Sequence, residues 1–171
     1  MKKNLPNVYV LTGICLITAL LLALVNNFTL PVIKAAEEKA TQEALLEVLP
    51  GGGTFEKKDV SAIDTSFCAT KVEEIYKASN GGYVVKLTSS GYSTGLLIMV
   101  GVNADGTVSG SKCLASAETL GYEKTYGSAL LGADKDNISG IATVSGATKT
   151  TTGYKNAVAD ALKIAAALSG N

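Results

Sequence analysis

The first part of the chain is apolar and free of charge over a long stretch. No charged residue occurs from Asn4 to Ile33, and the most apolar part runs from Val8 to Val25. A helix needs about 20 apolar residues to cross the hydrocarbon core of a bilayer, so this stretch is long enough to span a membrane. We therefore predict one membrane-spanning helix, with residues 1–31 as the anchor.

The residues on either side of this stretch indicate whether it is cleaved or retained, and how it is oriented in the membrane. A cleaved signal peptide is the alternative, but its apolar region is usually shorter, and Ile33–Ala36 is a poor cleavage site. A retained anchor in the cell membrane is therefore favoured. Lys2 and Lys3 precede the apolar stretch and favour a cytoplasmic N-terminus, which places the rest of the chain outside the cytoplasm.

A helical pattern continues beyond the anchor over residues 32–50. Charged residues separate apolar positions that recur at helical spacing, namely Ala36, Ala40, Ala44, Leu45, Val48 and Leu49. Pro50 and the glycines of 51–53 end the pattern. This segment is expected to be a stalk helix that continues from the membrane span.

The middle of the chain has the pattern of strands joined by tight turns. The predicted strands are Lys71–Lys77, Tyr83–Thr88, Leu96–Val102 and Thr107–Leu114. Ser79–Gly82 and Asn103–Gly106 are hairpin turns, of which the first is expected to need a positive φ at a glycine. The run Leu96–Val102 is continuously apolar, which is typical of a strand buried on both faces.

The last part of the chain is predicted to be a helix. Its apolar face comprises Ala157, Val158, Ala161, Leu162, Ile164, Ala165 and Leu168. Together these patterns predict an α+β fold: one N-terminal transmembrane helix, then a small, mainly antiparallel sheet packed by helices. Residues 51–171 form the expected extracytoplasmic domain.

Composition narrows the chemistry that the chain can carry. The 171 residues have no net charge and no His, so a basic nucleic-acid surface and a His-dependent catalytic triad are both excluded. The three cysteines, Cys15, Cys68 and Cys113, have no metal-binding spacing, and no metal site is expected. Cys68 and Cys113 could form a disulfide or remain as two free thiols. Redox chemistry would need an organic cofactor or a partner.

Hydroxyl side chains gather just before the predicted C-terminal helix. Val144–Gly153 contains Ser145, Thr148 and three further threonines at 150–152, with the small residues Gly146 and Ala147 and the positive charge of Lys149. Small residues let a backbone approach a ligand closely, and a helix N-terminus attracts phosphate. A hydroxyl-rich helix start without a ligand is the alternative, and it is the more common case on composition alone.

Two motifs resemble those of the FMN-binding-domain family, which includes the RnfG protein of the Rnf complex and the NqrC protein of the Nqr complex. Ser145-Gly146-Ala147-Thr148 is similar to the end of that family's flavinylation motif, Asp-x-x-Ser/Thr-Gly-Ala-Thr. Glu118-Thr119-Leu120-Gly121 is similar to its Glu-Thr-Pro-Gly-Leu-Gly segment, and Gly91-Tyr92 precedes both. With the anchor and the stalk, the resemblance covers nearly the whole chain, and the short length suits the Rnf protein better.

The resemblance implies a covalently bound FMN and an electron-transfer role. In that family the final Thr of the motif forms a phosphoester with FMN, which implies Thr148 here. The other implied cofactor-binding residues are Ser145, Gly146, Ala147, Lys149, Thr150 and Thr151 near Thr148, and Glu118, Thr119, Leu120 and Gly121, of which Glu118 and Thr119 would lie beside the ring. A Thr hydroxyl is a weak nucleophile and the chain has no His as a base, so attachment is expected to need a separate flavin transferase. The implied partners are the other membrane and soluble subunits of an Rnf-type ion-translocating ferredoxin:NAD oxidoreductase.

Four positions depart from the family pattern and keep other interpretations open. Ala142 stands where the family has Asp, Leu120 where it has Pro, and Tyr122-Glu123 where it has Leu-Gly. A structural or assembly subunit with an unflavinylated site is therefore the alternative function, and a membrane-anchored FMN protein of another electron chain is a third. Tyr122 could stack on a flavin, as could Tyr126, although packing is the more common role for either side chain.

Overall fold

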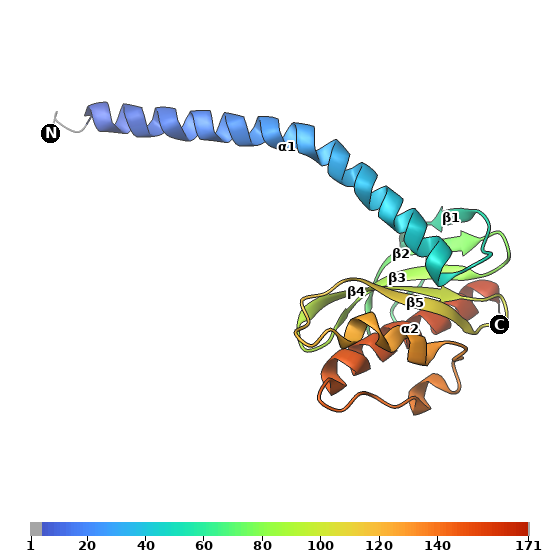
Figure 1. Cartoon of the computed structure of the whole chain (residues 1–171). Helices are drawn as coiled ribbons and strands as arrows, with labels where there is room; N and C mark the ends of the chain where they lie inside the picture. The colour runs from blue at the N-terminus through green and yellow to red at the C-terminus, as the bar shows by residue number, and fades with distance from the viewer. Residues whose placement is uncertain (1–4, 171) are drawn as a thin grey trace. The chain divides into compact units, whose positions relative to one another are not determined.

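A computed structural model describes residues 5–170 of the chain, which divides into two compact units, residues 1–42 and 43–171 (Figure 1). The first unit is helical and consists of most of α1 (Leu5–Val48). Its apolar side chains are exposed, among them Leu16, Leu22 and Phe28. Among the described residues, α1 is the one helix long and apolar enough to cross a membrane. Lys2 and Lys3, on which the predicted orientation rests, lie outside the described residues.

The second unit contains a five-stranded antiparallel sheet in which each strand pairs with the next in the sequence. The strands are β1 (Phe55–Lys58), β2 (Lys71–Ala78), β3 (Tyr83–Ser90), β4 (Thr94–Val102) and β5 (Val108–Ala115). The four strands predicted from the sequence are thus confirmed, with ends that differ by one or two residues. The helices and the sheet together confirm the predicted α+β class.

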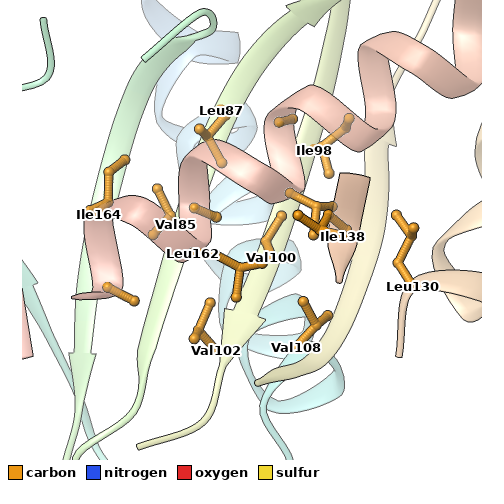
Figure 2. Close-up of a cluster of buried hydrophobic side chains, with 14 of the residues drawn as sticks. Val85, Leu87, Ile98, Val100, Val102, Val108, Leu130, Ile138, Leu162 and Ile164 are labelled. Carbon is orange, nitrogen blue, oxygen red and sulfur yellow. The ribbon is translucent and has the colours of Figure 1, made fainter. Parts of the chain in front are cut away.

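The two faces of the sheet are covered by different segments. The helix α2 (Thr148–Ser169) covers one face and buries an aliphatic core, part of which Figure 2 shows: Val85, Leu87, Ile98, Val100, Val102, Leu162 and Ile164. The end of α1 contributes Ala44, Leu45 and Val48, and the next residue contributes Leu49, to a second core with Tyr76, Ala78, Val84 and Met99. Residues 98–102 of β4 are accordingly buried on both faces, as their continuous apolar run predicts.

Two paired glycines let the end of α1 approach the second face closely. Gly101 of β4 lies opposite Gly110 of β5 in the ladder. A Cβ on Gly101 would lie 2.1 Å from the carbonyl oxygen of Val48, and one on Gly110 would lie 2.7 Å from it. Any larger residue at either position would force the helix end away from the sheet.

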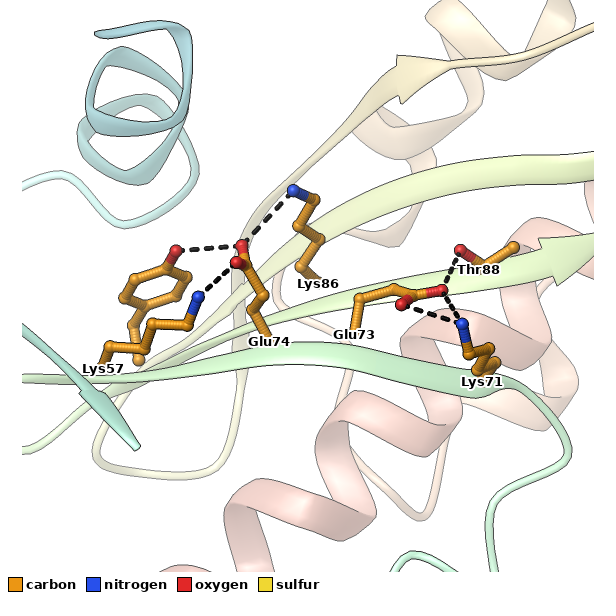
Figure 3. A network of polar contacts seen from close by, with 7 residues as sticks. Lys57, Lys71, Glu73, Glu74, Lys86 and Thr88 are labelled. Atoms are coloured by element: carbon orange, nitrogen blue, oxygen red, sulfur yellow. Dashed lines mark hydrogen bonds and ion pairs between the residues drawn. The ribbon is translucent and has the colours of Figure 1, made fainter. Parts of the chain in front are cut away.

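The strand β1 is held by polar contacts as well as by its backbone ladder (Figure 3). Lys57 of β1 pairs with Glu74 of β2, which also accepts hydrogen bonds from Tyr76 at 2.9 Å and from Lys86 at 3.3 Å. Partial burial by itself would raise the pKa of Glu74, but the contacts with Lys57, Tyr76 and Lys86 outweigh it and lower that pKa. Because its sequence Phe-Glu-Lys-Lys offers little apolar pattern, the prediction missed this strand.

A long connection leads from β5 to α2 and contains three short 3₁₀ helices, Tyr122–Lys124, Tyr126–Leu130 and Ile138–Gly140. A fourth, Val60–Ala62, follows β1. The helix α2 begins at Thr148, so Thr148–Gly153 forms the first turns of the helix instead of preceding it as the sequence analysis expected. Threonine and glycine are weak helix formers, which hid the true start of α2.

The turn between β2 and β3 generates a stability prediction. Gly81 has a φ of +88°, as the turn pattern predicts, and an added Cβ would lie 3.4 Å from that of Ala104. Val at position 81 would be strained in this conformation, so Gly81→Val should lower the free energy of unfolding by about 1 kcal/mol or more. Thermal unfolding of the full chain in detergent measures the change. Gly140→Val is the control, because Gly140 has open space around it; equal melting temperatures for the two variants would contradict the strain.

Candidate functional site

A cavity of about 440 Å³ lies where three separate segments of the second unit meet. Tyr92 comes from the turn between β3 and β4, 118–120 from the connection after β5, and 146–150 from the start of α2. Eight of the residues predicted to bind the cofactor line it: Glu118, Thr119, Leu120, Gly146, Ala147, Thr148, Lys149 and Thr150. Ligand pockets have volumes of about 300–1,000 Å³, so the cavity is large enough for an organic cofactor.

The start of α2 offers an anion site to this cavity. Ala147 caps the helix and has no side-chain acceptor, so no capping side chain occupies the N–H groups of the first turn. The first helical hydrogen bond runs from the N–H of Thr151 to the carbonyl of Ala147, which leaves the N–H groups of Thr148, Lys149 and Thr150 without partners in the helix. Gly146 allows the sharp turn into the helix with a φ of +84°. Free N–H groups and the helix dipole together favour a phosphate at this point.

Glu118 joins the three segments that line the cavity. Its carboxylate accepts hydrogen bonds from the backbone N–H groups of Ser93, at 2.9 Å, and of Tyr92, at 3.3 Å. The hydroxyl of Thr150 donates a hydrogen bond to the same carboxylate. Desolvation acts to raise the pKa of Glu118, but these three hydrogen bonds outweigh it and hold the pKa below its ordinary value. Through these three hydrogen bonds the Glu118 carboxylate joins α2 to the turn between β3 and β4, and we call this set of contacts the Glu118 latch.

The hydroxyl groups near the start of α2 differ in their availability. Thr148 is exposed, and its hydroxyl makes only a long contact of 3.4 Å with the carbonyl of Val144. The hydroxyl of Thr150 is engaged by Glu118, and the buried hydroxyl of Thr151 donates to the carbonyl of Ala147 at 3.0 Å. Ser145 is also exposed. Of the threonines that line the cavity on α2, Thr148 thus has the more accessible hydroxyl.

Three of the predicted site residues, Ser145, Gly121 and Thr151, do not line the cavity. Gly121 caps a 3₁₀ helix with a φ of +73°, and Thr151 accepts a hydrogen bond from the N–H of Val144 at 3.2 Å. Both support the shape of the connection and of the helix start. The cavity instead includes Tyr92, to which the sequence analysis gave no role although Gly91-Tyr92 was part of the resemblance.

Tyr126, Cys68 and Cys113 do not line this cavity. Tyr126 is buried, packs edge-on against Tyr154 with ring centroids 5.9 Å apart, and donates to the carbonyl of Ala142 at 2.9 Å. It has the packing role that the sequence analysis held to be the more common one. Cys68 and Cys113 are free thiols, which decides between the two alternatives. Burial raises the pKa of Cys68 to about 11 and also raises that of Cys113, so both thiols are protonated at neutral pH.

Comparison with known protein families identifies both parts of the chain. An FMN-binding domain matches residues 91–163, a range that contains every residue lining the cavity. An RnfG N-terminal region matches residues 1–48. The chain thus matches the RnfG family in its N-terminal region and an FMN-binding domain in its C-terminal part.

Proteins with similar sequences include subunits from two bacteria. The G subunit of the Na(+)-translocating ferredoxin:NAD(+) oxidoreductase complex of Acetobacterium woodii is 34% identical over 123 residues, which is 66% of this chain and 59% of that protein. The G subunit of the ion-translocating oxidoreductase complex of Cereibacter sphaeroides is 34% identical over 112 residues, or 62% of this chain and 50% of that protein. The chain thus matches between half and three fifths of the length of these relatives.

The departures from the family motifs have distinct places in the structure. Ala142 is exposed, and its contact with Tyr126 uses the backbone carbonyl. Leu120 is 64% exposed at the cavity. Glu123 is buried and accepts a hydrogen bond from the hydroxyl of Ser116 at 2.8 Å. The departures at 120 and 142 therefore alter surfaces, whereas Glu123 alters the packing of the connection after β5.

The Glu118 latch generates a pH prediction. In the unfolded chain Glu118 should titrate near the ordinary value of about 4.3, and in the folded chain its pKa is lower. The stabilisation by the latch is therefore complete above the unfolded pKa and is lost as the pH falls through the folded pKa. Glu118→Gln should lower the melting temperature at neutral pH, because its amide would face donors, and the difference from the unmodified chain should shrink in acid.

The matched control for the latch is Glu56→Gln, because the side chain of Glu56 is 71% exposed and pairs with Lys58 on the same strand. Melting temperatures measured from about pH 3 to pH 7 span the titration range of a carboxyl group. A Glu118→Gln deficit that stays constant over this range would show that the carboxylate does not carry the latch.

Proposed function

We propose that the chain is the FMN-carrying electron-transfer subunit of a membrane-bound, Rnf-type ion-translocating ferredoxin:NAD oxidoreductase. The observation that carries this proposal is the cavity at the start of α2, whose lining lies within the matched FMN-binding domain. The names of similar proteins describe them as G subunits of oxidoreductase complexes that translocate ions. The other subunits of the complex would be its partners, and the chain would act as a redox relay within that assembly instead of as an independent enzyme.

The chemistry of the cavity fits FMN at both ends of the cofactor. The free N–H groups of the first turn of α2 and the side chain of Lys149 suit a phosphate. Tyr92 and Leu120 offer apolar surface to a ring system, and Glu118 holds the cavity walls together. When bound, FMN supplies the electron chemistry, and the protein residues set its position and its surroundings.

Covalent attachment through the Thr148 hydroxyl is part of this proposal. In the attachment step the Oγ1 of Thr148 forms a phosphoester bond with the FMN phosphate of FAD. The pyrophosphate bond of FAD breaks and AMP leaves, while a base of the transferase takes up the proton of the Thr148 hydroxyl. The exposure of Thr148 supports access by a second enzyme. The engagement of Thr150 by Glu118 and of Thr151 by Ala147 makes these neighbours poorer acceptors.

The proposed layout follows the boundaries expected from the sequence. Residues 1–31 form the membrane anchor, residues 32–50 the stalk helix, and residues 51–171 the FMN-binding domain on the extracytoplasmic side of the cell membrane. The last turns of the stalk belong to the globular unit, because Leu45 and Val48 are buried in its second core. The exposed apolar length of α1 supports the anchor.

A structural or assembly subunit without flavin is the second candidate function. The observation that favours it is Ala142, which replaces the Asp of the family's flavinylation motif. This residue is exposed, so the Asp would belong to the surface that a transferase meets. The two candidates differ in a single measurable property, the mass of the mature chain.

Thr148 is predicted to be the attachment site. Thr148→Ala should give a folded, membrane-inserted chain that has lost covalent flavin, because the exposed hydroxyl contributes little to packing. The chain is produced together with a flavin transferase, and in-gel fluorescence after denaturation and intact mass are measured. The unmodified chain should gain the mass of one FMN less one water.

Ser145→Ala is the matched control for Thr148, because Ser145 is a second exposed hydroxyl three residues away. This variant should keep the fluorescent band, as should Thr150→Ala. A Thr148→Ala chain that still carries flavin would move the site elsewhere. An unmodified chain that never gains the mass would favour the structural subunit and identify Ala142 as the decisive departure.

The side of the membrane is predicted separately. In a chain with Cys15, Cys68 and Cys113 replaced by Ser, a cysteine introduced at the exposed position of Lys135 should react with a membrane-impermeant thiol reagent in intact cells. A cysteine introduced at Lys3 should react only after the membrane is opened. The reverse pattern would place the domain in the cytoplasm while leaving the FMN assignment intact.

A further inference from the structure

Tyr92 is an aromatic side chain left open to solvent at the edge of the cavity. It is 73% exposed, although it stands in the tight turn between two strands of the sheet core. It lines the cavity beside the first turn of α2. A tyrosine this exposed contributes little to folding by burial, so its place at the cavity points to a role in binding.

The backbone that carries Tyr92 is held in place. Its N–H and that of Ser93 donate to Glu118, which is joined to Thr150 of α2. Gly91 lies so close to this latch that a Cβ there would be 2.6 Å from an oxygen of Glu118. The position of the Tyr92 backbone is thus coupled to the helix start where the phosphate would lie, while its ring stays free of core packing.

A second apolar side chain lines the same cavity from another segment. Leu120, from the connection after β5, is 64% exposed. A planar, weakly polar ring system would cover both exposed surfaces at once, with an offset-stacked arrangement on the tyrosine. The free phosphate site at the start of α2 lies in the same cavity, so the phosphate and the ring of one FMN molecule can be bound together.

The ammonium group of Lys149 lies over the ring of Tyr92. Its Nζ lies 5.8 Å from the centre of the Tyr92 ring, a cation–π contact. Lys149 directly follows Thr148, so a phosphate on Thr148 would give this ammonium group a stronger partner than the ring. The face of Tyr92 that Lys149 now covers would then be available for stacking.

We propose that Tyr92 is the aromatic wall of the flavin site, stacking on the isoalloxazine ring opposite Leu120, with Glu118 as the residue that positions it. This inference rests on the proposed function and adds a ligand-contacting residue to it. Stacked tyrosine quenches flavin emission, because its phenol transfers an electron to the excited flavin and then receives it back. The quenching depends on contact and on the ease of oxidation of the aromatic side chain.

The experiment measures emission per bound flavin in the full chain, loaded by the transferase and purified in detergent. Tyr92→Phe keeps the ring but is hard to oxidise, so emission should rise severalfold. Tyr92→Trp is oxidised more easily, so emission should stay low or fall. Tyr92→Leu should also brighten the flavin, and if it fails to load, the Phe and Trp variants still decide. Tyr122→Phe is the matched control, since Tyr122 is 39% exposed but does not line the cavity, and it should change nothing.

The outcomes separate the two proposals. A loaded chain whose emission is the same in the unmodified, Phe and Trp forms overturns the role of Tyr92 and leaves the FMN function intact. Brightening by Tyr122→Phe in place of Tyr92→Phe also overturns it. An unmodified chain that lacks the FMN mass and also fails to bind added FMN overturns both proposals.

Discussion

The close approach of α2 to the end of β3 is the constraint on which the site depends. A Cβ on Gly153 would lie 2.2 Å from the carbonyl oxygen of Ser90, so only glycine lets the helix come this near. The hydroxyl of Ser89 donates to the carbonyl of Gly153 at 2.8 Å and fixes the contact. Because the helix touches the strand within two turns of its start, its first turn must lie beside the turn that carries Tyr92. The free N–H groups of α2 and the aromatic ring therefore face one cavity.

The antiparallel pairing of the strands brings the third segment of the cavity, residues 118–120, next to the other two. In the register of the sheet, Ser89 of β3 lies opposite Leu96 of β4, and Leu97 lies opposite Ala115 at the end of β5. The chain therefore leaves β5 at the end of the sheet where β3 turns into β4. Glu118 is then close enough to accept hydrogen bonds from the N–H groups of that turn. Near this end of the sheet, Leu87 of β3 and Leu96 and Ile98 of β4 are buried in the core beneath α2. The shape of the site is thus a consequence of strand register more than of local loop structure.

The sequence predicted those elements that have a local hydrophobic or turn pattern, and it missed features that depend on the tertiary fold. The strands β2 to β5 have strong apolar patterns and glycine turns, and the sequence predicted them. The strand β1 has no such pattern, because it is held by the ion pair between Lys57 and Glu74 and by its backbone hydrogen bonds to β2. The motif residues 118–120 and 146–150 were identified through resemblance, yet their meeting in one cavity depends on register and on Gly153, which no local pattern reveals. Tyr92 was missed as a site residue because a single exposed tyrosine has no distinguishing pattern before the fold places it at the cavity.

The replacement of the motif Asp by Ala142 can be judged from the same geometry. The connection at this point is held by the hydroxyl of Tyr126 on the backbone carbonyl of Ala142, a contact that any side chain at 142 would allow. The turn into α2 depends on Gly146 and on the hydrogen bonds of Thr151 instead. Loss of the carboxylate therefore leaves the residues that line the cavity unchanged, and it removes a negative charge from the exposed surface at position 142. If the chain is flavinylated as proposed, the departure would act on recognition by the transferase, whereas binding of a flavin in the cavity would depend on residues that it leaves unchanged.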